Sequence, residues 1–97
     1  MAKIKLIRQP TVANQQMSYE FDVLGFVFLI SNFTNNNILV WLDENCSDEE
    51  KVLIPAGEWR EIEVNRGDRS VRNGSKVVNI MPIETNSIGV EVQVEKW

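Results

Sequence analysis

Histidine is absent from all 97 residues of this sequence. The imidazole side chain is the commonest general base in enzymes and the commonest zinc ligand, so its absence excludes catalytic sites of the Ser–His–Asp and Cys–His kinds. Catalysis by two carboxylates stays chemically open, but nothing in the placement of the 14 acidic residues selects a pair. We therefore predict a protein that is not an enzyme and that uses no metal or other cofactor.

Cysteine is nearly absent as well, since Cys46 is the only one. A single cysteine cannot form an intramolecular disulfide, and its acidic neighbours disfavour the reactive thiolate. The surrounding stretch, residues 43–50, matches a calcium-binding loop at its first, third and fifth positions. Asp48 stands where such a loop needs glycine, and Ile54 stands where it needs glutamate. We expect a solvated acidic turn there, with a looser calcium loop as the alternative.

Long hydrophobic runs are missing too. The longest, residues 23–30, includes Gly25 and is far shorter than the roughly 20 residues of a membrane-spanning helix, so we expect a buried strand. The first ten residues mix basic and apolar side chains and do not resemble a signal peptide. The formal charge of −4 is unlike that of a nucleic-acid binder. The sequence thus predicts one domain over residues 1–97, with neither a membrane nor nucleic acid as its partner.

Turn residues and short alternating segments dominate what the chain does contain. Glycine, proline and asparagine interrupt it about every 8–12 residues, and apolar and polar residues alternate between these breaks, as in residues 58–64 and 90–95. Such alternation is typical of strands with one buried and one solvated face. The predicted strands are residues 3–9, 17–23, 26–33, 37–43, 51–54, 58–64, 76–83 and 88–96. We predict an all-β antiparallel sandwich of about eight short strands, jelly-roll-like because that order hides strand edges, or else immunoglobulin-like.

The same alternation predicts which side chains form the core. We expect the buried residues to be Ile62, Val64, Val90, Val92, Val94 and alternate members of residues 26–30. Trp59 shares a strand face with Glu61 and Glu63, so it should lie outside the main core. Exposed aromatic area of this kind is typical of contact surfaces, although a small apolar cluster beneath a loop would account for it equally well.

A basic segment interrupts this acidic protein. Residues 65–75 contain an Arg-Gly-Asp triplet at positions 66–68. We expect Gly67 to form part of a turn there, and we expect no adhesion signal. The segment forms either a solvated hairpin with a tight Asn73-Gly74 turn, an electrostatic contact with an acidic partner surface, or a weaker phosphate site. The candidate interaction residues are Arg66, Arg69, Arg72, Lys76 and Trp59, with Asp43 and Glu44 as acidic counterparts on a neighbouring copy.

Three segments together resemble small β-sandwich proteins of tailed-bacteriophage virions. They are residues 30–41 (ISNFTNNNILVW), 53–58 (LIPAGE) and 79–92 (NIMPIETNSIGVEV). The resemblance implies a structural or accessory protein of the capsid-decoration, head or tail type. Such a protein would be assembled in the bacterial cytoplasm into the virion and would bind itself or other virion proteins. The alternative is a small ligand-binding module of the carbohydrate-binding kind, in which Trp41, Trp59 or Trp97 would stack on a sugar.

Overall fold

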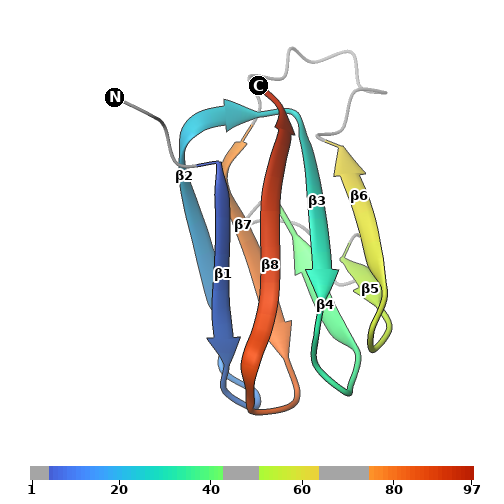
Figure 1. Ribbon diagram of the computed structural model, residues 1–97. Coiled ribbons are helices and arrows are strands. Elements are labelled where there is room, and N and C mark those ends of the chain that lie inside the picture. Colours follow the sequence, from blue (N-terminus) through green and yellow to red (C-terminus); the bar gives the residue numbers. More distant parts are fainter. Residues whose placement is uncertain (1–4, 43–50, 64–74) are drawn as a thin grey trace.

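Eight strands and no helix make up the part of the chain that the computed structural model describes, which is residues 5–42, 51–63 and 75–97 (Figure 1). The strands are β1 (Leu6–Thr11), β2 (Met17–Gly25), β3 (Val27–Asn32), β4 (Ile38–Trp41), β5 (Val52–Ile54), β6 (Trp59–Glu63), β7 (Ser75–Pro82) and β8 (Asn86–Lys96). Each of the eight predicted strands overlaps one of these, so the predicted all-β class is confirmed. Within these ranges there is no helix long and apolar enough to cross a membrane.

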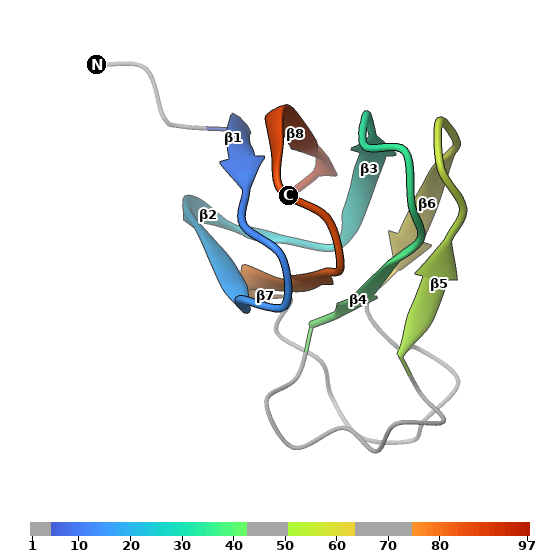
Figure 2. The same ribbon diagram turned by 90° about the horizontal axis from the view of Figure 1, so that it is seen from below.

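The strands form two antiparallel sheets that face each other. Sheet A has the order β1-β8-β3-β6, and sheet B has the order β2-β7-β4-β5 (Figure 2). The pairs β1–β8, β2–β7, β3–β6 and β4–β5 nest inside one another, as if one long hairpin had been wrapped around the core. The pair β3–β8 then joins two of these strand pairs into sheet A, and the pair β4–β7 joins the other two into sheet B. This is the jelly-roll order, the first of the two predicted arrangements.

Side chains from the inner faces of both sheets form a single core. The fully buried apolar residues include Tyr19, Phe28, Ile30, Ile38, Val40, Ile54, Val78, Ile80, Val90 and Val92. The buried hydroxyl of Tyr19 donates a hydrogen bond to the carbonyl oxygen of Val90 at 2.9 Å, which satisfies its polar atom. Burial also raises the pKa of this hydroxyl above its usual range. This hydrogen bond links β2 of sheet B to β8 of sheet A across the core.

The predicted core is confirmed for all but one of its members that the structure describes. The buried members of the predicted set are Ile62, Val90, Val92, Val94, Phe28 and Ile30. Val64 lies outside the described residues. Phe26 is the exception, because it sits at the bend between β2 and β3 and is 41% exposed.

The apolar run of residues 23–30 does not form the single buried strand that its composition predicts. It crosses from sheet B to sheet A, since β2 ends at Gly25 and β3 begins at Val27. A side chain at position 25 would lie 2.6 Å from the ring of Phe28, so only glycine allows this close crossing. The run is apolar because its two halves face the core from opposite sheets, and not because it is buried along its whole length.

Candidate interaction site at one end of the sandwich

Four of the chain's connections gather at one end of the sandwich, which we call the loop end. They are residues 12–16, 33–37, 55–58 and 83–85, and they lie at the bottom of Figure 1 and face the viewer in Figure 2. They share this end because successive strands run in opposite directions, so every second connection returns to the same side. Hydrogen bonds between side chains and backbone join all four of them.

Asn32, the last residue of β3, links the second and third of these connections. Its buried side-chain Nδ2 donates toward the carbonyl oxygens of Asn36 at 2.8 Å, Ile54 at 3.1 Å and Pro55 at 3.1 Å. Its Oδ1 accepts from the backbone N–H of Thr34 at 2.9 Å and from the Thr34 hydroxyl at 2.7 Å. The asparagine-rich turn is therefore held from within by one amide whose donor and acceptor atoms are both used.

Glu84 links the asparagine-rich turn to the connection between β7 and β8. One carboxylate oxygen accepts from Asn36 Nδ2 at 2.6 Å, and the other accepts from Asn86 Nδ2 at 2.9 Å and from the backbone N–H of Asn35 at 3.2 Å. Hydrogen bonds to the ionised form, from the Asn86 amide first and the Asn35 backbone second, hold the pKa of Glu84 below its usual range. The carboxylate is thus charged at neutral pH and organises donors from two loops.

The connection between β1 and β2 is hydrogen-bonded to the connection between β7 and β8. The Thr11 hydroxyl donates to the carbonyl oxygen of Glu84 at 2.7 Å, and the backbone N–H of Ala13 donates to Thr85 Oγ1 at 3.0 Å. The backbone N–H of Asn14, which has a φ of 61°, donates to the carbonyl oxygen of Pro82 at 2.9 Å. Asparagine tolerates this left-handed conformation better than most residues, which explains its place in the turn.

Apolar side chains stand exposed on this hydrogen-bonded frame. Val12, Ile83 and Ile88 are each about half exposed, and Phe33 is 42% exposed. The backbone N–H of Phe33 donates to the carbonyl oxygen of Gly89 at 3.0 Å, which brings Phe33 beside the segment that carries Ile88. Exposed apolar groups near one another mark contact surfaces, and a frame that is already ordered loses little entropy on binding. The loop end is therefore suited to docking against another protein.

The residues that the sequence predicts as an interaction surface are not brought together by the described structure. Trp59 begins β6 in sheet A at the loop end and is 64% exposed, which confirms that it lies outside the main core. Lys76 lies near the start of β7 in sheet B, at the opposite end, and is exposed. The remaining members, Arg66, Arg69, Arg72, Asp43 and Glu44, lie outside the described residues, as do the proposed acidic turn and the Arg-Gly-Asp triplet.

The loop end contains a part of each segment behind the phage resemblance. The turns within residues 30–41, 53–58 and 79–92 form three of its four connections.

The network around Glu84 was not predicted from the sequence. One signal could have indicated it, because in an antiparallel sandwich with eight strands the first, third, fifth and seventh connections share an end. The polar residues Asn36, Glu84 and Asn86 fall in or beside those connections.

Comparison with known proteins adds no identification. No family model, no curated protein and no solved structure matches this chain. Across residues 5–42, 51–63 and 75–97, no group of three or more acidic, cysteine or histidine side chains is placed to hold a metal ion.

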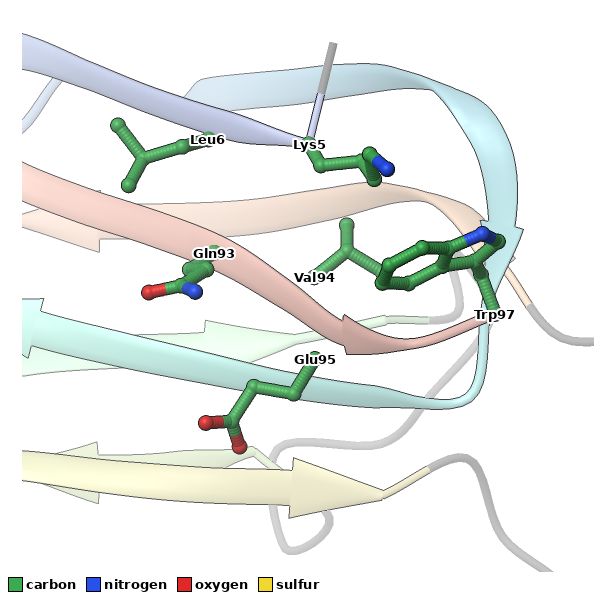
Figure 3. Close-up of a pocket in the computed structure, with 6 residues that line it drawn as sticks. All are labelled: Lys5, Leu6, Gln93, Val94, Glu95 and Trp97. Atoms are coloured by element: carbon green, nitrogen blue, oxygen red, sulfur yellow. The ribbon is translucent and has the colours of Figure 1, made fainter. Parts of the chain in front are cut away.

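A second candidate site lies at the end opposite the loop end. It is an open depression of about 380 Å³ on sheet A beside the C-terminal residue (Figure 3). Its lining consists of Lys5, Leu6, Gln93, Val94, Glu95 and Trp97. The Trp97 ring is 58% exposed, with Lys5 Nζ 4.0 Å from the centre of the ring. Trp41 cannot serve as a stacking platform in the described arrangement, because it is only 7% exposed.

Proposed function

We propose that this protein is a non-enzymatic structural component that works by assembly through protein–protein contacts, with the loop end as a contact surface. The observation that carries this proposal is the pairing of exposed Phe33, Ile83 and Ile88 with a frame held by Asn32 and Glu84. A binding loop that is already ordered needs no folding step, so the apolar area it buries contributes more fully to affinity. The phage resemblance of the same turns supports a virion as the assembly, with other virion proteins or further copies as partners.

The contact surface is tested by replacing one aromatic side chain. Phe33→Ser removes apolar area at the loop end, while Phe26→Ser removes the same side chain from the opposite end at nearly equal exposure, 42% against 41%. We expect Phe33→Ser to weaken association, measured by sedimentation velocity and native mass spectrometry alone and with purified virion proteins. Phe26→Ser should leave association unchanged. Equal behaviour of the two variants would refute the loop end as the surface.

The virion assignment needs a separate measurement. If a phage that carries this gene incorporates the protein, mass spectrometry of purified particles should detect it at a fixed copy number relative to the major capsid protein. Particles that lack the protein, although infected cells produce it, would refute the virion assignment and leave the contact surface to be judged on its own.

A ligand-binding function is the second candidate, and the depression beside Trp97 favours it. An exposed indole can stack on the apolar face of a sugar ring, and the neighbouring Gln93 amide and Glu95 carboxylate could bind its hydroxyl groups. We expect such binding to change tryptophan fluorescence during titration with a glycan panel, and to be lost in Trp97→Ala but kept in Trp59→Ala. Fluorescence that no glycan alters would reject this function.

A further inference from the structure

We infer that copies of this chain join edge to edge, with β1 of one copy pairing antiparallel to β6 of the next, so that sheet A continues from copy to copy. This inference deepens the assembly function proposed above by naming a second copy as the partner. It uses the edge strands of sheet A and not the exposed Phe33, Ile83 and Ile88 of the loop end, so the two contacts can be tested separately.

Strand direction permits this continuation without any reorientation. Sheet A is antiparallel throughout, and its order begins with β1 and ends with β6. Four alternating strands leave β6 running opposite to β1. A second copy placed beside the first in the same orientation therefore presents its β1 antiparallel to β6 (Figure 1). Both strands are edges, and edge strands display backbone groups that can bind a further strand.

The backbone hydrogen bonds within sheet A show which residues direct their N–H and C=O groups toward the free edges. The carbonyl oxygen of Lys5 accepts from the backbone N–H of Val94, so alternation turns the backbone groups of Leu6 and Arg8 away from β8 and toward the edge. On β6, the carbonyl oxygen of Glu58 accepts from the N–H of Asn32. The same alternation then turns Trp59 and Glu61 toward the other edge.

One register brings these groups opposite each other. If Arg8 of one copy faces Glu61 of the next, antiparallel pairing places Pro10 opposite Trp59. The pairing then covers β1 and β6 over residues 6–10 and 59–63. Pro10 has no N–H to donate, but its carbonyl oxygen can accept from the N–H of Trp59, and proline is tolerated on edge strands. The ring of Pro10 also supplies an apolar surface for the indole.

Side-chain charge and exposure fit this register. Arg8 is loosely held in its own copy, since its Nε lies 3.8 Å from a carboxylate oxygen of Glu91 and more than half of its side chain is exposed. Glu61 is exposed, and its carboxyl group beside Glu95 raises the pKa of Glu95. Two neighbouring carboxylates favour the approach of a cation, and the guanidinium of Arg8 from the next copy would supply it.

Pairing of β6 with itself is less favourable than pairing with β1. If a two-fold axis passed through Glu61, Glu61 of one chain would face Glu61 of the other. An axis through Arg60 would likewise bring the two Arg60 side chains opposite each other. Like charges directly opposite each other on adjacent strands are destabilising. The contact is therefore head to tail, and repetition of a head-to-tail contact gives a ring or a filament.

Charge reversal tests the pairing. Arg8→Glu and Glu61→Arg should each raise the dissociation constant for self-association about tenfold, because each turns an attraction across the strands into a repulsion. An equimolar mixture of the two variants should associate again, since each variant offers the other an opposite charge at both edges. The double variant should also associate. The measurements are native mass spectrometry and sedimentation velocity over a dilution series at low ionic strength.

Glu20→Arg provides the matched control, because it makes the same charge change on β2, an edge strand of sheet B. It should associate like the wild type, and far-ultraviolet circular dichroism should show that every variant is folded. A wild type that associates while the charge reversals change nothing would overturn the edge pairing and leave the loop-end function standing. A wild type that remains monomeric at every concentration would also overturn it, and the virion measurement would then decide the proposed function.

Discussion

Removal of the Asn32 amide is expected to destabilise the whole fold, although the residue lies at the end of a strand. Asn32→Ala deletes the group that holds the asparagine-rich turn against the connection between β5 and β6. It leaves the buried carbonyl oxygen of Ile54 without the amide donor and the Thr34 N–H without its acceptor. The Thr34 hydroxyl keeps an acceptor, because the carbonyl oxygen of Asn36 lies 2.9 Å from it.

The size of this effect follows from the hydrogen bonds. The two protons of Nδ2 are shared among three carbonyl oxygens, and Oδ1 accepts from the Thr34 N–H and hydroxyl. Because the hydroxyl can donate to the Asn36 carbonyl instead, about three bonds are lost. Each is worth about 0.5–1.5 kcal/mol net. Two of the three carbonyls are only partly buried, so water can replace part of the loss. We therefore expect a decrease of about 2–4 kcal/mol in the free energy of unfolding.

Urea denaturation followed by tryptophan fluorescence measures this decrease. With a slope of about 1.5 kcal/mol/M, a common value for a small domain, the midpoint should fall by on the order of 1–3 M. Asn32→Asp should be at least as damaging at neutral pH, because it sets a carboxylate oxygen against carbonyl oxygens. Asn37→Ala, exposed in the same turn, should change stability by less than about 0.5 kcal/mol. If Asn32→Ala behaves like Asn37→Ala, the turn is not held in the way described.

Further measurements test two glycines, a core valine, a buried amide and a carboxylate. Gly89→Ala should cost more than about 2 kcal/mol in urea denaturation, because φ is +80° and the new carbon would strike backbone. Gly57→Ala, at +74° with open space, should cost about 1 kcal/mol. Val92→Ala should cost about 1–3 kcal/mol by the same assay, and a change of a few tenths would contradict its place in the core. Asn79 is buried, and its Nδ2 has no hydrogen-bond partner among the described residues, while its Oδ1 accepts from the hydroxyl of exposed Ser18 at 2.8 Å. Water can replace Asn79 as the partner of Ser18, so Asn79→Leu should cost under about 1 kcal/mol or stabilise. Glu84 has a depressed pKa in the folded state, so its stabilisation is present above the unfolded pKa of about 4.3 and is lost as pH falls through the folded value. Thermal unfolding should therefore show a steeper acid loss for wild type than for Glu84→Gln.

The sequence by itself determined the strands and most of the core. Alternation with a period of two is a local property, because the pleat of a single strand sends successive side chains to opposite faces. It therefore placed Val90, Val92 and Val94 inside and Trp59 outside before any partner strand was known. Turn residues likewise divided the chain into eight strands, since glycine, proline and asparagine interrupt extended backbone by their own conformational preferences.

The tertiary structure alone decided which connections meet and which residues bind one another. Asn36 and Glu84 lie 48 positions apart, and Thr11 lies 73 positions from the carbonyl oxygen it binds, so no local pattern relates them. Their contact depends on the nested pairing of β1 with β8 and of β3 with both β6 and β8. The apolar run of residues 23–30 shows the same limit. Its hydrophobic composition predicts contact with the core, but it does not predict which of the two sheets each residue belongs to. Strand pairing is a choice among many alternatives of similar local energy, and only the packing of both sheets on one core selects among them.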